Sequence, residues 1–345
     1  MPIYLKSSRL FVSHCTRVVY IFVTCPTESQ ASEIINKLGV SCGFAFICFN
    51  VVFYCIRVLK NCRKIGEGVY GEVFLWRAGD GRARVLKIVP IAGDIKVNGE
   101  PQKDFHEIIS EIVIAICYIK TFRAGETEGQ TVRCVYGPYP SRLLDLWELY
   151  DETKGSENDN PASLPDHQQY IVLELANAGE DLESYQFNSA EQAYALFVAF
   201  GLAVGEESYQ FEHRDLHWGN VLIAPTDQKV SALTLNVQYP LRAALYNDLG
   251  ADESLFGAVG DYQFEVYRLM RDKLGNDWKN FEPYTNILWL HYTLDKMITA
   301  LRYKRTNTKI HKQYINKLRG LKGRILEYDS AAQLVLTDNE FHTIF

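Results

Sequence analysis

The sequence has no Cys-x-x-Cys pair, no internal repeat and no low-complexity tract in its 345 residues. None of its eight cysteines lies beyond residue 134; they are Cys15, Cys25, Cys42, Cys48, Cys55, Cys62, Cys117 and Cys134. Scattered thiols encode neither a zinc site nor a disulfide framework, so we expect reduced cysteines in an intracellular protein. A basic excess is also missing, because 36 Lys and Arg stand against 42 Asp and Glu. The net charge of -6 gives no general electrostatic reason to bind nucleic acid.

Long hydrophobic runs are scarce, and the one candidate for a membrane span lies near the N-terminus. The nineteen residues 38–56 carry no charge, and that length could just cross a bilayer. Gly39 and Gly43, together with many β-branched and aromatic residues, suit a buried strand pair equally well. A cleaved secretory signal fits poorly, because Arg17 interrupts the basic start. We interpret residues 1–58 as a hydrophobic leader outside the domain that follows, with membrane anchoring as the alternative.

From residue 59 the pattern becomes that of a globular domain, and 47% apolar residues suffice for a sizeable core. The stretch KIGEGVYGEVFLWRAGDGRARVLKIVPI predicts three strands, joined by a glycine turn and an Asp80-Gly81 hairpin turn. Apolar residues at helical spacing predict a helix over residues 103–120. A small antiparallel sheet followed by a helix is therefore expected.

The remainder of the chain changes from strand to helix patterns. A polar loop or insertion is expected at residues 151–166. Residues 168–185 predict a buried strand, a bend and a helix start. Helical spacing over residues 190–213 and 284–303 indicates that the second half is mainly helical.

The stretch GEGVYGEV has the spacing G-x-G-x-x-G-x-V, formed by Gly66, Gly68, Gly71 and Val73. A triphosphate must be approached by bare backbone, and glycines at these positions allow a hairpin to fold over it. A dinucleotide-binding turn would need a helix after the third glycine, whereas EVFLW is typical of a strand. A glycine-rich hairpin that binds nothing remains the alternative for this motif taken alone.

Two charged residues follow at the positions that phosphate transfer requires. Lys87 lies on the third predicted strand, where its ammonium could reach the α- and β-phosphates. Glu111, on the predicted helix 103–120, could hold that lysine in place. A solvated lysine and a surface glutamate are both commonplace, so the pair counts only together with the other motifs.

The stretch HRDLHWGN carries the strongest signal. His213, Arg214, Asp215 and Asn220 match H-R-D-x-x-x-x-N, in which the Asp orients the substrate hydroxyl and the Asn amide oxygen binds a metal. His217 adds a second histidine, but two histidines without a further acid or thiol are weak evidence for a metal site.

Together with GDYQFEVYRLM and YTNILWLHYTLDKM, these motifs resemble haspin-type serine/threonine protein kinases. The resemblance runs from about Leu59 to the end. It implies an α+β, bilobal protein-kinase-like fold over residues 59–345, with a small antiparallel-sheet lobe over about 59–175 and a mainly helical lobe over about 180–345. The implied activity is transfer of the γ-phosphoryl of ATP, with Mg²⁺, to a threonine of the histone H3 tail.

The resemblance also assigns roles to individual residues. It implies Asp215, Lys87 and Glu111 as catalytic, Asn220 as a magnesium ligand, and Asp261 as a support of the catalytic loop through backbone hydrogen bonds. The implied nucleotide contacts are Ile65, Gly66, Gly68, Gly71, Val73, Lys87, Ala176, Ala178 and Asp181. The implied contacts to a basic substrate are Asp181, Asp252 and Glu253. For Asp252 and Glu253, a solvated loop without a substrate role is the alternative interpretation. A nuclear, chromosomal monomer is expected.

One element of the pattern is missing. Protein kinases carry a D-F-G triplet, replaced by D-Y-T in haspins, whose Asp joins magnesium to the phosphates. No such triplet follows Asn220, and the region is short by roughly twenty residues, the size of a small surface loop. Asp227 comes too early, and Asn236 would be a poor magnesium ligand. Three explanations stay open: recruitment of Asp248, a pseudokinase that binds nucleotide or histone tail without turnover, or a sequence shortened by splicing or by a flawed gene prediction.

A last feature is basic. Residues 301–324 carry nine Lys or Arg and could make a weak electrostatic contact with nucleosomal DNA. A solvated helix face is the favoured interpretation of these charges.

Overall fold

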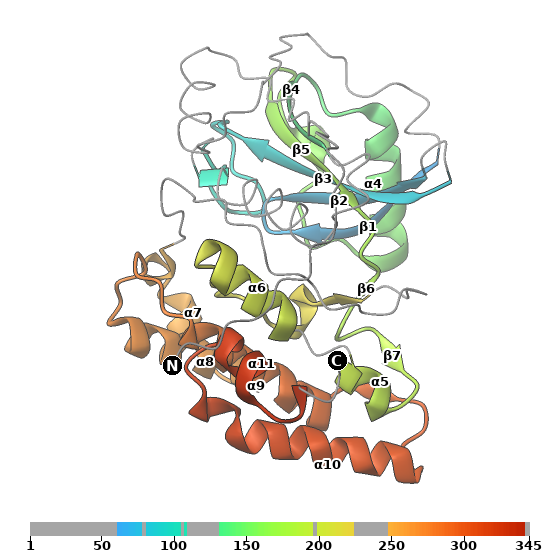
Figure 1. Cartoon of the computed structure of the whole chain (residues 1–345). Coiled ribbons are helices and arrows are strands. Elements are labelled where there is room, and N and C mark those ends of the chain that lie inside the picture. The colour runs from blue at the N-terminus through green and yellow to red at the C-terminus, as the bar shows by residue number, and fades with distance from the viewer. Residues whose placement is uncertain are drawn as a thin grey trace, which may run out of the picture.

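The computed structural model describes residues 61–77, 81–104, 107–108, 131–195, 199–223 and 248–341. The leader, most of the predicted helix 103–120 with Glu111, and the stretch 224–247 lie outside the described residues. The described chain forms a small β-rich lobe above a mainly helical lobe (Figure 1). The α+β bilobal fold predicted from the sequence is therefore confirmed.

Five strands form one antiparallel sheet in the order β1-β2-β3-β5-β4. They are β1 (Cys62–Gly68), β2 (Gly71–Arg77), β3 (Ala83–Ile91), β4 (Thr131–Tyr136) and β5 (Gln169–Ala176). The three strands predicted around the two turns are β1, β2 and β3, which pair as consecutive hairpins. The buried strand predicted after residue 168 is β5. The helix start predicted behind it is wrong, because β6 (Glu180–Asp181) and a turn occupy that place.

Helix α4 (Ser141–Lys154) covers one face of this sheet. Leu143, Leu146 and Trp147 follow one another at helical spacing and are buried. Leu143 and Leu146 pack with sheet residues such as Phe74 and Ile88 in one apolar cluster. The polar loop predicted for residues 151–166 begins inside α4, and the rest of it is irregular apart from the short helix η1 (Pro161–Ser163).

The second lobe is built from helices around one apolar core. The helices are α5 (Ala190–Ala195), α6 (Ala199–Tyr209), α7 (Ser254–Gly257), α8 (Tyr262–Leu274), α9 (Tyr284–Thr299), α10 (Lys309–Arg324) and α11 (Ala331–Thr337). The short helices are η2 (Trp218–Asn220), η3 (Leu249–Ala251) and η4 (Ile325–Glu327). Two short strand pairs complete the lobe: β6 pairs with β8 (Leu222–Ile223), and β7 (Gln186–Phe187) pairs with β9 (Arg302–Tyr303). Helix α9 is buried almost all round, so it forms the centre of the lobe.

The membrane alternative concerns residues 38–56, which lie outside the described residues. Among the helices that the structure describes, none is long and apolar enough to cross a bilayer.

The end of the chain is held to the helical lobe by Asp338, which is buried behind α11. Its carboxylate accepts hydrogen bonds from Arg324 Nε at 2.7 Å and Nη2 at 3.0 Å, and from the Tyr328 hydroxyl at 2.8 Å. Burial alone would raise the pKa of Asp338, but these bonds and one from the Glu340 N–H lower it overall. The ionised form is therefore the one that stabilises the fold.

We expect Asp338→Asn to lower the free energy of unfolding at pH 7 by about 2 kcal/mol, the typical loss for a buried hydrogen-bonded charge. Because the folded pKa is depressed, the contribution is present above about pH 4 and is lost as pH falls through the folded value. Urea titrations at pH 7 and pH 3 check both points. Asp329→Asn, at an exposed position, is the control; a deficit of Asp338→Asn that stays constant down to pH 3 would contradict the assignment.

Candidate active site

The glycine hairpin between β1 and β2 borders open space. A Cβ added to Gly66 or Gly68 would meet no atom within 4 Å, so bare backbone is available to a ligand there. Gly71 differs, because a Cβ on it would lie 2.1 Å from the carbonyl oxygen of Ile88. The family resemblance implies that Gly71 contacts the nucleotide. Its close packing against β3 already requires a glycine at this position.

Strand register brings Lys87 onto the sheet face that α4 leaves uncovered. Val73 pairs with Lys87, and Lys87 pairs with Leu173, so the three form one row across β2, β3 and β5. Side chains alternate along a strand, and the neighbouring Ile88 is buried on the opposite face. Val73 and Lys87 are half-buried. Glu111, the predicted partner of Lys87, lies outside the described residues, so that pairing stays a prediction.

The connection between the lobes begins where β5 ends at Ala176 and reaches β6 after three residues. Gly179 has a φ of +90° and donates its N–H to Asn177 Oδ1 at 3.2 Å. A left-handed residue at this bend favours glycine. Ala176 and Ala178, predicted to read adenine, thus lie at the end of β5 and just before β6. Figure 1 shows β6 where the β-rich lobe meets the helical lobe.

Leu222 is a functional candidate that the sequence analysis missed. It lies on β8, paired with Asp181 of the crossing segment, and 55% of it is exposed. A large apolar side chain is open to solvent directly beside the crossing, and an aromatic base would cover it. The available signal was its place two residues after Asn220, the predicted metal ligand, in the alternating stretch NVLI.

The catalytic loop is held by its arginine. Arg214 has a φ of +61°, which is rare outside glycine and costs energy. Its guanidinium pairs with Glu212 Oε1 at 2.8 Å and donates to the carbonyl oxygens of Trp278 at 2.5 Å and Asn280 at 2.9 Å. These largely buried contacts offset the backbone strain and link the loop to the segment after α8.

The carboxylate of Asp215 is oriented from two sides. The Tyr267 hydroxyl of α8 donates to Oδ1 at 2.5 Å, and Asn220 Nδ2 donates to Oδ2 at 3.0 Å. Burial and the neighbouring carboxylate raise the pKa of Tyr267 far above its ordinary value, so its hydroxyl keeps the proton that it donates. Each carboxylate oxygen has two acceptor sites. A further acceptor site therefore remains for a substrate hydroxyl.

Asn220 has the orientation that a metal ligand needs. Its Nδ2 also donates to the Asp215 carbonyl oxygen at 2.7 Å, so Oδ1 is the atom left to bind a cation. Amide oxygen fits Mg²⁺, but that ion prefers carboxylates and usually takes more than one protein ligand. Among the described residues, no group of three or more His, Cys, Asp or Glu is placed to hold a metal. The stretch that would supply the second ligand, 224–247, lies outside them.

Asp248, considered as a recruited ligand, lies at the start of η3. Its Oδ1 accepts the Gly250 N–H at 3.0 Å and caps that short helix. This explains Asp248 by local structure alone.

The two histidines of the loop have structural roles. His213 is half-buried, and the burial of its ring lowers its pKa; the ring packs edge-on against Phe211 with centroids 6.0 Å apart. His217 Nδ1 accepts the Gly219 N–H at 3.2 Å and begins η2. His217 Nε2 lies 3.9 Å from Asp215 Oδ1.

Asp261 supports the catalytic loop in a different way from the one predicted. Its Oδ1 accepts the Gln263 N–H at 2.9 Å and caps α8, and its Oδ2 pairs with the ammonium of Lys296. That ammonium lies 4.7 Å from the ring centre of Trp218 in the loop. The expected backbone hydrogen bonds are thus replaced by an ion pair and a cation–π contact.

The predicted substrate acids are partly committed to local structure. Asp181 Oδ1 accepts the Ser184 N–H at 2.7 Å, and Asp252 Oδ1 accepts the Ser254 N–H at 3.0 Å. The charge of Asp252 also raises the pKa of Tyr70 in the glycine hairpin, after burial and the charges of Glu100 and Glu107. Glu253 is exposed beside it.

A β-rich lobe with a glycine hairpin and a strand lysine, over a helical lobe with an H-R-D-x-x-x-x-N loop, defines the protein kinase class. Comparison with known families narrows this class. The family model described as "Haspin like kinase domain" matches residues 33–331. The chain therefore belongs to the haspin-type serine/threonine protein kinase family.

Named relatives agree with this assignment. The chain is similar to "Serine/threonine-protein kinase haspin homolog" of Drosophila melanogaster, with 42% identity over 82% of this chain and 56% of the relative. It is 38% identical to "Serine/threonine-protein kinase haspin" of Mus musculus, over 82% of this chain and 42% of the relative. The chain thus spans about half the length of the curated relatives it matches. The match to a solved MAP kinase from Leishmania major covers 82% of this chain and 83% of the MAP kinase chain, at 15% sequence identity. Its TM-score of 0.33 is too low to add to the assignment.

We expect Tyr267→Phe to lower kcat for phosphate transfer by about tenfold, the loss of one charged hydrogen bond, while the KM for ATP stays unchanged. Steady-state kinetics measures both. Tyr303→Phe is the matched control, because it removes a buried hydroxyl bond to the Met297 carbonyl oxygen, away from the loop. Equal kinetic losses in the two variants would show that Tyr267 only stabilises the fold.

Proposed function

We propose that this protein transfers the γ-phosphoryl group of ATP to a threonine or serine hydroxyl of a basic peptide, with the N-terminal tail of histone H3 as the substrate that the family implies. The observation that carries the proposal is the pairing of Asp215 and Asn220. One carboxylate is oriented for a hydroxyl, and the adjacent amide oxygen is turned outward for a metal. This is the arrangement that phosphate transfer in kinases requires.

The chemistry assigned to the residues is a balanced exchange. Asp215 orients the attacking hydroxyl and takes up its proton as the new O–P bond forms. The bond between the γ-phosphorus and the bridging oxygen breaks, and ADP leaves. Lys87 would neutralise charge on the phosphates, and Asn220 Oδ1 would bind Mg²⁺, which supplies further charge stabilisation.

Negative charge at the mouth of the cleft supports a basic substrate. Glu100 and Glu107 of the upper lobe and Asp252 of the lower lobe all raise the pKa of Tyr70 in the glycine hairpin, after the effect of burial. The charges of three carboxylates therefore act on one residue of the hairpin. Lys103, whose Nζ is 4.2 Å from the Tyr70 ring centre, reduces the local charge without cancelling it. Such a field attracts basic peptides and repels acidic ones.

The decisive experiment incubates the full chain with Mg²⁺, labelled ATP and an H3 tail peptide, beside the same peptide with alanine at its threonine. We expect transfer to the threonine peptide alone, and a loss of at least about 10²-fold in Asp215→Asn, because a positioned base contributes that much. Nucleotide affinity is measured separately. Binding without transfer would overturn the proposal and support the pseudokinase alternative, for which the missing triplet after Asn220 is the reason.

A second experiment tests the basic substrate. Asparagine caps helices as well as aspartate, so Asp252→Asn keeps the Ser254 contact type and removes only charge. We expect the KM for the peptide to rise about threefold at low salt, with less effect at 0.5 M salt and with kcat unchanged. Asp145→Asn on α4, away from the cleft, is the control. A peptide KM that is equal in both variants would argue against an acidic substrate site.

Contact with nucleosomal DNA, a nuclear location and a monomeric state remain part of the proposal. Two of the nine basic side chains at residues 301–324 form ion pairs within the fold, since Lys322 pairs with Asp295 at 2.6 Å and Arg324 with Asp338 at 2.7 Å. Exposed residues such as Lys309, Lys312 and Arg319 supply the charge on which a DNA contact would depend.

A further inference from the structure

The outer face of the glycine hairpin contains a buried lysine. Lys64 of β1 has a side chain with no exposed surface, and its Nζ lies 2.5 Å from both Glu67 Oε2 and Glu72 Oε2. The rings of Trp147 and Tyr150 of α4 enclose the same ammonium, at 5.3 Å and 4.4 Å from their centres. One cation thus ties both strands of the hairpin to α4.

The segment after α4 binds the hairpin directly. We call residues 155–160 the clamp loop. Ser156 Oγ and the Glu157 N–H donate to the carboxylate of Glu67 at 2.6 Å and 2.8 Å. Asn158 Nδ2 donates to the Gly68 carbonyl oxygen at 3.1 Å and to Glu72 Oε1 at 2.8 Å. The bond to Gly68 reaches the backbone at the tip of the hairpin.

The tip is also held from the turn after β3. Asn98 Nδ2 donates to the Val69 carbonyl oxygen at 2.8 Å. Asn98 is itself fixed to the clamp loop, because its N–H donates to Asp159 Oδ2 at 2.9 Å and its Oδ1 accepts the Asp159 N–H at 2.7 Å. The carbonyl oxygens of two successive residues, Gly68 and Val69, are therefore bonded to one network.

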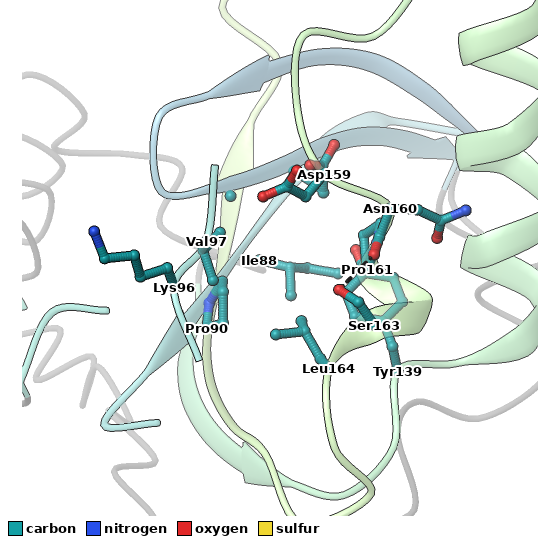
Figure 2. Close-up of a pocket in the computed structure, with 12 residues that line it drawn as sticks. Ile88, Pro90, Lys96, Val97, Tyr139, Asp159, Asn160, Pro161, Ser163 and Leu164 are labelled. Atoms are coloured by element: carbon teal, nitrogen blue, oxygen red, sulfur yellow. Dashed lines mark hydrogen bonds between the residues drawn. The ribbon is translucent and has the colours of Figure 1, made fainter. Parts of the chain in front are cut away.

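The clamp loop continues onto the outer face of the sheet. Asp159, Asn160 and Leu164 face Ile88 and Pro90 of β3 across a small pocket (Figure 2). Lys87 lies on the opposite face of β3 from Ile88. The clamp therefore acts from behind the hairpin and leaves the cleft side open.

We propose that the clamp loop is a positioning device that holds the glycine hairpin in its nucleotide-binding conformation. This inference rests on the proposed function, because it concerns the same nucleotide site. A glycine-rich turn is flexible, and ordering it on binding costs conformational entropy. Bonds that order it beforehand reduce that cost and strengthen nucleotide binding. Ser156 and Asn158 act through the hairpin, so they are positioning residues and not catalytic ones.

The ionisation state of Glu67 fits this role. Burial alone would raise its pKa, but the bonds from Lys64, Ser156 and the Glu157 N–H lower it overall. The carboxylate is thus charged at neutral pH and accepts all three bonds. The motif GEG places this acid between two glycines, where its side chain points away from the open side of the hairpin.

Asn158→Ala is the test variant, and Asn160→Ala is its matched control. Asn160 lies two residues further in the same loop, and its side chain caps η1 through the Ala162 N–H at 2.9 Å. We expect Asn158→Ala to exchange the amide hydrogens of residues 66–73 at least about fivefold faster, and to weaken Mg·ATP binding by about three- to tenfold in calorimetry. Asn160→Ala should leave both values unchanged. Ser156→Ala and Asn98→Ala should each repeat the effect through a different contact, which also covers the case in which Asn158→Ala fails to fold.

The outcomes separate the clamp from the proposed activity. Unchanged exchange in the Asn158→Ala hairpin overturns the clamp, and so does faster exchange with unchanged nucleotide affinity. If the unaltered protein binds Mg·ATP without transferring phosphate, the proposed kinase activity fails while the affinity comparison still decides the clamp. If the unaltered protein binds no nucleotide, the positioning role is overturned together with it.

Discussion

The buried amide of Asn286 anchors the start of the catalytic loop to the core of the helical lobe. Asn286 of α9 accepts the His213 N–H through Oδ1 at 3.0 Å, and its Nδ2 donates to Glu206 Oε1 and the Phe211 carbonyl oxygen at 2.9 Å. Glu206 in turn accepts the Ala331 and Ala332 N–H groups at the start of α11. Buried polar groups are costly unless all are satisfied, so this network admits few alternative arrangements. The loop, α6, α9 and α11 are joined by it, and Asp215 is reached two residues further on.

Around this anchor the site is assembled from both lobes by different kinds of force. In the helical lobe, Asp215 is oriented by hydrogen bonds from Tyr267 and Asn220. The guanidinium of Arg214 is held by Glu212 and by two backbone carbonyl oxygens. Above, the position of Lys87 follows from sheet register, since a shift of one residue would turn it to the α4 side. The lower half is specified by polar contacts and the upper half by strand pairing and apolar burial.

The carboxylates around the glycine hairpin fall into two groups. Glu67 and Glu72 share one ion-pair partner, the enclosed Lys64, whereas the charges of Glu100, Glu107 and Asp252 act on Tyr70 in the glycine hairpin. Asp252 and Glu107 also accept local hydrogen bonds, from Ser254 and from the Asp104 N–H. Two predicted parts of the site lie outside the described residues: Glu111, and the stretch 224–247 that would supply a second magnesium ligand beside Asn220.

The sequence alone determined the family, the antiparallel sheet, the glycine hairpin and the loop around Asp215, because these depend on local spacing and alternation. It also indicated a helical second half. Only the tertiary structure decided which side chains meet: Tyr267 with Asp215, Lys296 with Asp261 and Trp218, and the clamp loop with Gly68. The partners in these contacts lie 35 to 90 residues apart along the chain, and no periodicity encodes such a distance. Packing within each lobe brings these partners together and fixes their geometry.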